Sequence, residues 1–297
     1  MARESFGDRL MVIIIYVFLS LLAITTLYPF LNALAISFNE GMDTSRGGIT
    51  LWPRVFTLEN YGVVFKDERL INGFVVSVLR TVIGTISSIF CTAIFAYGMS
   101  KRELIGRKYY MIMCIITIYF SGGLIPTFLL IRNLGLMNSF WVFIIPSLVG
   151  VWNMIIFRTF FQGLPVGLEE SARIDGCGNW GTFFRIVIPL SGPVIATLSL
   201  FTAVAHWNEW FLAGIYISDV EKYPIQTILR QILLSNIVTD QGGLDSSALA
   251  HMAKVRTITS KSLSMATMMV ATLPIITVYP FVQKHFVKGV LVGSLKE

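Results

Sequence analysis

The chain has 297 residues, of which 55% are hydrophobic and 13% are charged, and its net charge is +6. Soluble domains use about a quarter charged residues, so this composition, with a mean hydropathy of +0.72, excludes an ordinary soluble globular domain. The basic residues are dispersed at the edges of apolar segments, which indicates membrane topology and no nucleic-acid partner. Cys91 and Cys114 lie inside apolar runs, and Cys177 has no neighbouring His or Cys, so we predict no metal site.

Six apolar segments are long enough to cross a bilayer, whose core of about 30 Å needs roughly 20 helical residues. We predict spans at residues 10–38, 71–99, 109–131, 139–161, 191–217 and 263–282. Ala33-Leu34-Ala35 in the first span resembles a signal-peptide cleavage site, but the apolar stretch exceeds the usual length of about 7–15 residues, which favours a span.

Basic residues gather on one side of these spans. Lys101, Arg102, Arg107 and Lys108 form the densest cluster, between the second and third spans. The positive-inside rule makes this loop cytoplasmic, and alternation then places both termini and the loop before the fifth span in the cytoplasm. The segments on that side carry 12 Lys and Arg in 66 residues, against 10 in 84 for the external segments, so the charge bias agrees with this orientation.

The stretch Leu164 to Leu190 is a polar island between the fourth and fifth spans. Pro165 suits the first turn of a helix, and carboxylates in the early turns complement the helix N-terminus. Gly176 and Gly178 can end this helix in a left-handed conformation. The residues predicted to share one helix face are Leu168, Ala172 and Asp175, and those predicted to build a second short helix before Pro189 are Trp180, Phe183, Phe184, Ile186 and Val187. Such a bracket is too short to fold alone and needs another protein surface.

The island carries a family resemblance. Glu170-Ser171-Ala172-x-x-x-Gly176, then nine residues, then Ile186-x-Ile188-Pro189 resembles the cytoplasmic signature of binding-protein-dependent ABC importer permeases. Ser171 and Ile188 replace the usual Ala and Leu, and both changes are conservative. Segments similar to the MalG-like sugar-importer branch are Ala96-Tyr97, Ser100-Lys101, Trp207 to Trp210 and Phe286 to Gly289, and Phe120 to Thr127 resembles its LplC/YtcP-like group. The resemblance covers nearly the whole chain.

This resemblance implies an all-α membrane protein with the six-helix type I ABC importer (MetI-like) permease fold, in a bacterial-type cytoplasmic (inner) membrane. It implies a transport subunit and not an enzyme, with no cofactor in this chain. A G-x-x-x-x-G-K-[ST] phosphate loop is absent from the sequence, so ATP and Mg would bind a partner ATPase. The implied partners are a second, homologous permease subunit in a heterodimer, two ATPase subunits, an extracytoplasmic solute-binding protein and the lipid bilayer.

The resemblance also implies that residues 162–190 are a coupling loop, docked in a groove of the ATPase. The residues expected to couple are Glu169, Glu170, Ala172, Asp175, Gly176, Ile186 and Pro189. Glu170 would contact a basic residue of the ATPase, and Gly176 would allow a close turn. The implied divisions of the chain are residues 1–70 (N-terminal segment, first span and external loop), 71–290 (five-helix transmembrane domain) and 291–297 (cytoplasmic tail).

Ionisable groups inside spans are costly and therefore indicate function. Arg80 lies in the second span, where we favour a side chain that reaches the membrane interface over one in the solute path. The strongest cluster is His206, Trp207, Asn208, Glu209 and Trp210 in the fifth span. Aromatic faces and hydrogen-bonding groups suit a sugar ring, so this cluster either lines the substrate path or packs on the partner subunit. His206 and Glu209 are three residues apart and could form an ion pair or a proton relay. Gly122, Gly123 and Pro126 are expected to kink or closely pack the third span.

The favoured function is import of an oligosaccharide, and the LplC/YtcP-like resemblance favours one that contains uronic acid. One alternative is an ABC permease for another solute, such as glycerol phosphate or a peptide. An alternative of a different class is a secondary transporter, for which Glu209 is the available intramembrane carboxylate. The external segment 218–262, with Tyr223-Pro224, a periodic helix to Ile237 and Gly242-Gly243, is either a docking ledge for a solute-binding protein or a lid on the bundle.

Overall fold

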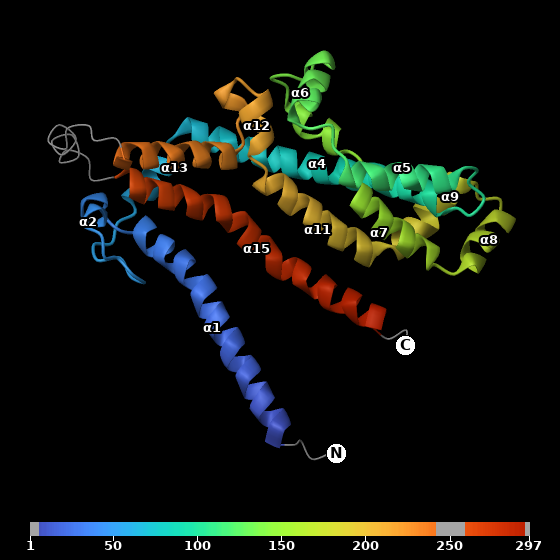
Figure 1. Cartoon of the computed structure of the whole chain (residues 1–297), viewed down its shortest axis with the longest axis horizontal. Helices are drawn as coiled ribbons and strands as arrows, with labels where there is room; N and C mark the ends of the chain where they lie inside the picture. The colour runs from blue at the N-terminus through green and yellow to red at the C-terminus, as the bar shows by residue number, and fades with distance from the viewer. Residues whose placement is uncertain (1–5, 242–258, 295–297) are drawn as a thin grey trace. The chain divides into compact units, whose positions relative to one another are not determined.

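The computed structural model describes residues 6–241 and 259–294, which are mainly helical and contain one isolated antiparallel bridge, between Asn39 and Phe56 (Figure 1). The chain forms two compact units, residues 1–71 with 229–273 and residues 72–228 with 274–297. The predicted Gly242-Gly243 turn and the last three residues of the predicted tail lie outside the described residues.

Three helices are long and apolar enough to cross a membrane by themselves: α1 (Phe6–Ser37), α4 (Glu68–Ser100) and the Ser260–Val278 part of α15 (Ser260–Ser294). Three further spans are counted only if each bent helix pair is taken as one, which gives up to six. The predicted number of spans therefore agrees with the structure. The helix of the sixth predicted span, α15, continues beyond residue 282 to Ser294.

The third and fifth predicted spans are not continuous helices. The third is α5 (Arg107–Tyr119) followed by α6 (Leu124–Asn133), which are bent by 114°. Gly123 has φ +84°, a conformation that glycine adopts without steric cost, so the predicted kink in this segment is confirmed. The fifth is α11 (Gly192–Asn208) followed by α12 (Phe211–Tyr216), with extended backbone at Glu209. Hydropathy measures how apolar a segment is and does not register such changes of direction.

The fourth predicted span also has two parts. Two 3-10 turns, η1 (Phe140–Phe143) and η2 (Ile145–Ser147), precede α7 (Val151–Gln162) at an angle of 45°. Pro146 lies in the first positions of η2, where its missing N–H costs no hydrogen bond. This break exposes the backbone around Leu148 to Gly150, which Thr92 of α4 then satisfies: its hydroxyl donates to Leu148 O at 3.3 Å and accepts from Gly150 N at 3.2 Å.

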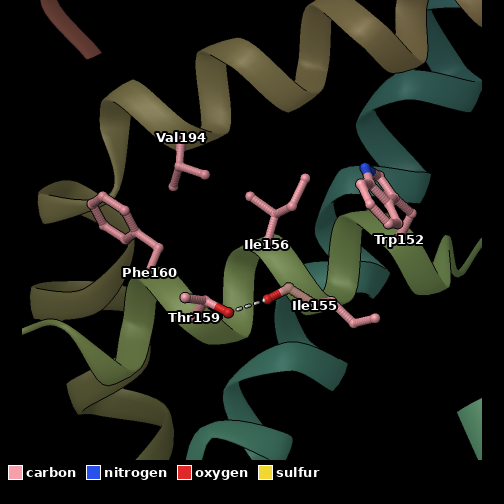
Figure 2. A pocket seen from close by; sticks show the side chains of 6 residues that line it. All are labelled: Trp152, Ile155, Ile156, Thr159, Phe160 and Val194. Carbon is pink, nitrogen blue, oxygen red and sulfur yellow. Dashed lines mark hydrogen bonds between the residues drawn. The ribbon is translucent and has the colours of Figure 1, made fainter. Parts of the chain in front are cut away.

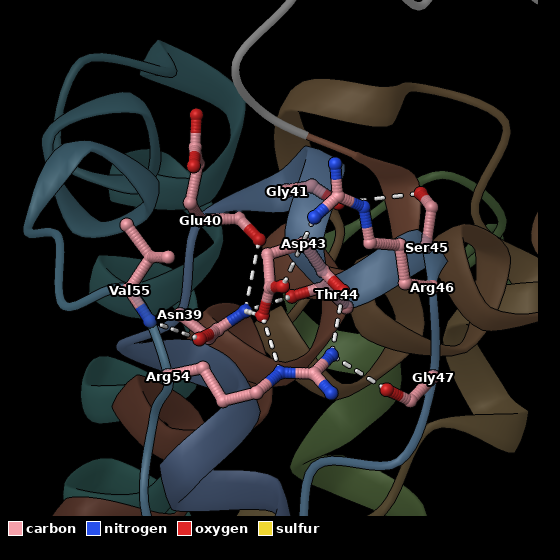
Figure 3. Close-up of polar contacts among 10 residues, drawn as sticks. All are labelled: Asn39, Glu40, Gly41, Asp43, Thr44, Ser45, Arg46, Gly47, Arg54 and Val55. Atoms are coloured by element: carbon pink, nitrogen blue, oxygen red, sulfur yellow. Dashed lines mark hydrogen bonds and ion pairs between the residues drawn. The ribbon is translucent and has the colours of Figure 1, made fainter.

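The first unit is built on α1 and a closed polar loop. Side chains of α1 from residue 6 to residue 31 are exposed, so this apolar helix needs lipid or another chain around it. Asn39 is fully buried after α1, and its side-chain amide donates to Asp43 Oδ2 at 3.0 Å and accepts from Val55 N at 3.0 Å. Arg54 Nε donates to the same Asp43 oxygen at 2.9 Å, as Figure 3 shows. The loop is therefore closed by buried hydrogen bonds. Its two short helices are α2 (Gly41–Ser45) and α3 (Glu59–Val64).

The second unit contains two apolar clusters. In one, α7 packs against α5 and α11, and the largest fully buried side chains are Met154, Phe157, Phe183 and Leu198. In the other, α12 packs against η1, around Phe143, Ala213 and Tyr216. The predicted helix of the external segment is present as α13 (Ile225–Gln241), preceded by η4 (Val220–Lys222).

Candidate functional site

The polar island, residues 164–190 (the 164–190 loop), begins with α8 (Val166–Ile174). Pro165 is the residue before its first turn, where the fixed φ of proline costs nothing, and Glu169 lies in the first turn. At the other end Gly176 has φ +82°, Cys177 N donates to Ala172 O at 2.8 Å, and Gly176 N donates to Arg173 O at 3.1 Å. This is a Schellman motif, so the predicted left-handed stop at Gly176 is confirmed. The same prediction for Gly178 is wrong, because its φ is −72° and it precedes the next helix.

α8 has an inner and an outer face. Ala172 is buried and Glu169 is half-buried, whereas Glu170 and Ile174 lie on the opposite side and are exposed, Ile174 by 86%. Glu170 and Ile174 are four residues apart, so a carboxylate and a large apolar side chain stand next to each other in solvent. Leu168 and Ala172, predicted to share one face, are four residues apart in α8, with Leu168 42% exposed and Ala172 buried, while Asp175 follows the helix as its exposed C-cap.

Two ion pairs of opposite polarity connect α8 to the end of α4 and the turn that follows it. The Lys101 ammonium donates to Glu169 Oε2, and it also lies 4.1 Å from the centroid of the Tyr97 ring. Arg173 lies 3.8 Å from the carboxylate of Glu103. The sequence places Glu169 among the coupling residues, and its carboxylate is engaged inside the chain. Glu169 thus orients α8, while Glu170 faces outward.

The second half of the 164–190 loop is anchored in the core. It runs through α9 (Asn179–Thr182), a π-helical turn η3 (Phe183–Val187) and α10 (Ile188–Leu190). These helical turns lie where the sequence predicts a second short helix. Phe183 and Val187 are fully buried, and the Phe183 ring lies 5.0 Å from that of Tyr97. Ile186 is half-buried and Pro189 is exposed, in the first turn of α10. A bend of 81° at Ser191 then leads into α11.

A charged pair lies deep in the second unit. Arg80 of α4 is 1% exposed, and its Nη2 donates to Glu209 Oε2 at 2.6 Å while Nη1 donates to Glu209 O at 2.8 Å. The guanidinium carbon lies 4.6 Å from the centroid of the Phe143 ring. The prediction that Arg80 reaches the membrane interface is therefore wrong, because a carboxylate 129 residues further along the chain provides its partner inside the protein.

Glu209 lies at the break between α11 and α12, and its two carboxylate oxygens have different partners. Its Oε1 accepts from Phe211 N at 2.6 Å and from Leu212 N at 2.9 Å, which satisfies the first N–H groups of α12. Glu209 thus pairs with Arg80 and with backbone rather than with His206, for which the sequence left an ion pair or a proton relay open. The His206 ring instead lies against Gly84, where a Cβ would come within 2.7 Å of it.

These residues border a cavity of about 320 Å³, which we call the Arg80 cavity. Among the described residues, its lining includes His206 and Glu209 but not Trp207, Asn208 or Trp210. Trp207 is buried, and its ring meets that of Phe74 edge-on at 5.7 Å. The predicted cluster is therefore divided between a cavity wall and packing.

Sequence reasoning missed most of the cavity wall. The sequence singles out Arg80 but favours the membrane interface for it, and the lining residues that it misses altogether are Ser88, Phe143, Ser147, Asn153 and Thr202. The signal that could have located the α4 side is a stripe of small and hydroxyl side chains at helical spacing, namely Ser77, Thr81, Gly84, Ser88 and Thr92, in an otherwise apolar span. No comparable stripe marks Asn153 and Thr202, which the fold brings together with a hydrogen bond of 3.1 Å.

A second hollow, of about 390 Å³, is apolar in character. It is lined by Trp152, Ile155, Ile156, Thr159 and Phe160 of α7 and by Val194 of α11, as Figure 2 shows. The Thr159 hydroxyl donates to Ile155 O of its own helix at 2.8 Å. This groove therefore offers little to a polar solute.

Residues 61–292 match the model of the family described as binding-protein-dependent transport system inner membrane component. The chain belongs to this family. It is thus a membrane-embedded permease component of an ABC importer and a transport subunit, not an enzyme, as the resemblance implied. The secondary-transporter alternative is wrong. Among the described residues, no group of three or more His, Cys, Asp or Glu side chains is placed to hold a metal ion.

Relatives of this ABC permease cover its whole length. The polygalacturonan/rhamnogalacturonan transport system permease protein YtcP of Bacillus subtilis is 43% identical over 289 residues, 97% of this chain and 99% of the relative. Protein LplC of the same organism is 42% identical over 272 residues, 91% and 90% of the two chains. A chain in the crystal structure of a bacterial ABC transporter involved in the import of the acidic polysaccharide alginate has a TM-score of 0.86 at 28% identity, and the match covers 96% of this chain and 100% of that one. The predicted fold and sugar-importer branch are confirmed.

Proposed function

We propose that this ABC permease imports an oligosaccharide that contains uronic acid. The observation that carries the proposal is that full-length relatives at 43% identity and at a TM-score of 0.86 are named for polygalacturonan, rhamnogalacturonan and alginate, which are all acidic polysaccharides. The alternative solutes, glycerol phosphate and a peptide, have no such support from these relatives.

We further propose that the 164–190 loop couples the permease to a cytoplasmic ATPase, which would bind the ATP and Mg. The geometry supports this role, because Glu170 and Ile174 project from α8 and are exposed, while Glu169 and Ala172 hold the helix from behind. A carboxylate beside a large apolar side chain suits a groove that offers a basic residue and an apolar floor. Asp175 and Gly176 would complete this face, and Ile186 and Pro189 would transmit its movement to α11.

The assembly we propose contains a second, homologous permease subunit, two ATPase subunits and an extracytoplasmic solute-binding protein. Both termini lie in the cytoplasm in this arrangement, which the charge bias of the loops supports. Residues 71–290 form the transporting domain, preceded by the first span and followed by a short tail. The external segment 218–262 contributes either a docking ledge or a lid.

The coupling proposal is tested with Glu170→Lys, and Glu221→Lys is the matched control, since both carboxylates are exposed but Glu221 lies in η4, away from the loop. We expect Glu170→Lys to lose co-purification with the ATPase and at least tenfold of ATP-dependent uptake, because the new ammonium would repel a basic partner residue. The control should retain both. ATPase association and uptake that survive Glu170→Lys would show that coupling does not depend on this carboxylate.

The solute proposal is tested by uptake of trigalacturonate into proteoliposomes that contain the complete transporter and its binding protein. We expect uptake that depends on ATP and on the binding protein. Uptake of a neutral trisaccharide in preference to trigalacturonate would contradict the assignment of an acidic solute.

A further inference from the structure

The Arg80 cavity contains a charged group with a donor that has no partner. Arg80 is 1% exposed and lines the cavity, and its two terminal nitrogens are engaged by Glu209. Its Nε, in contrast, is buried without a hydrogen-bond partner. Native proteins leave few buried donors unsatisfied, and a guanidinium binds carboxylates through two parallel N–H groups. Arg80 thus retains one donor without an acceptor, in a side chain that lines the cavity.

Glu209 does not depend on Arg80 alone. One of its oxygens accepts from Phe211 N and Leu212 N, and this interaction would persist if the other oxygen lost Arg80. A second carboxylate could therefore share or take the guanidinium without leaving Glu209 as a buried charge with no partner. The side chain of Glu209 is 27% exposed, against 1% for Arg80, so it is the more accessible member of the pair.

The remaining wall suits a sugar ring. Ser88 and Ser147 carry hydroxyl groups, and Asn153 donates to the Thr202 hydroxyl at 3.1 Å, which leaves the amide oxygen for other donors. Phe201 adds exposed apolar ring surface, against which the C–H face of a sugar can pack. The cavity therefore combines one cation, several neutral hydrogen-bonding groups and aromatic surface.

We propose that the Arg80 cavity is a uronate-selective subsite on the solute path, in which the carboxylate of a sugar unit accepts from Arg80 Nε and competes with Glu209 for Nη2. Glu209 acts as a resident carboxylate that holds Arg80 in place when the cavity contains no solute. Neutral sugars gain only the hydroxyl and ring contacts, so Arg80 provides the discrimination. This assignment rests on the proposed function, because it requires an acidic solute.

The test compares binding of trigalacturonate with binding of its carboxyl-reduced, neutral counterpart. Both are titrated by saturation-transfer NMR against the purified transporter complex without its binding protein, so that the selectivity of that protein does not contribute. We expect the wild type to bind trigalacturonate about tenfold more tightly than the neutral probe, since a charge-assisted bond is worth at least one decade in affinity. Glu209→Gln preserves an amide oxygen for the α12 N–H groups but removes the competing charge, and should tighten trigalacturonate binding about tenfold again.

Arg80→Met should abolish the preference for the charged probe. Because Arg80→Met leaves Glu209 with only the α12 N–H groups as partners and lowers stability, the double variant Arg80→Met/Glu209→Gln serves as the neutral version of the same cavity, and it should bind both probes equally. A double variant that still prefers trigalacturonate, or a Glu209→Gln variant with unchanged affinity, would overturn the subsite. If the wild type imports trigalacturonate while every variant binds like the wild type, the subsite alone is wrong. If the complete wild-type transporter neither binds nor imports it, the proposed function falls as well.

Discussion

The 164–190 loop and the Arg80 cavity each contain a carboxylate paired with a basic side chain, but their surroundings differ. In the loop, Lys101 and Glu169 are 22% and 24% exposed, and water screens much of their attraction. In the cavity, Arg80 is 1% exposed, so almost no water stabilises its charge. The first pair positions a helix whose proposed coupling face lies on the other side, whereas the second pair is itself a wall of the candidate site.

This difference predicts unequal costs of losing the cation. Arg80→Met leaves the Glu209 carboxylate, which is 27% exposed, with only the first N–H groups of α12 as partners, and the expected loss of stability approaches the about 3–5 kcal/mol of a broken buried pair. Lys101→Met removes a partly exposed pair, with an expected loss of about 0.2–1 kcal/mol. Thermal unfolding of the two purified variants checks this prediction. Equal shifts of the two unfolding midpoints would show that losing the Arg80–Glu209 pair costs no more stability than losing the Lys101–Glu169 pair.

Close packing should be the next largest effect. A Cβ at Gly84 would lie 2.7 Å from the His206 ring, so Gly84→Ala must displace a side chain of the cavity wall, at an expected cost of about 1–3 kcal/mol. Gly98→Ala on the same helix is the control, because a Cβ there meets nothing within 4 Å and alanine favours helix. The midpoint of thermal unfolding should fall for Gly84→Ala and hold or rise for Gly98→Ala. Unchanged stability in both variants would mean that His206 moves aside freely.

In the 164–190 loop, the expected effect of a glycine substitution comes from backbone conformation and not from a steric clash. Gly176 has φ +82° with open space around it, so Gly176→Ala should cost only the backbone strain of about 1–2 kcal/mol. The effect is local: we expect faster proteolysis of residues 164–190 and weaker ATPase association. Gly167→Ala, inside α8 and equally open, should slow proteolysis. Equal proteolysis rates in the two variants would show that the left-handed conformation of Gly176 does not determine the stability of the loop.

The smallest effect concerns the polar loop of residues 39–57 that follows α1. Hydrogen bonds from Arg54 and Asn39 lower the pKa of the Asp43 carboxyl below its usual 3.8. Because the folded pKa is depressed, the stabilisation is present above about pH 4 and disappears as the pH falls through the lowered value. Hydrogen exchange of residues 39–57 should therefore be slower in the wild type than in Asp43→Asn at neutral pH, with the difference shrinking in acid. A difference that stayed constant down to about pH 2 would contradict the charged pair.

The sequence alone determined the fold class, the number of spans and the boundaries of the 164–190 loop. Apolar length predicts spans because the bilayer core fixes how many residues cross it. Pro165 and Gly176 predict the start and end of α8 because each residue restricts or permits a backbone conformation locally. The outward face of Glu170 follows from the same local logic, since helical spacing separates it from Ala172.

The Arg80 cavity, in contrast, was decided by tertiary structure. Arg80 and Glu209 lie 129 residues apart, and hydropathy assigns each to a separate apolar span without indicating that they meet. At the break between α11 and α12 one carboxylate caps α12 and pairs with Arg80, an arrangement that requires α4 to pack beside the end of α11. Local sequence patterns determine where helices begin and end. The pairing of Arg80 with Glu209 depends on tertiary packing, because only in the packed chain does each charge offset the desolvation cost of the other.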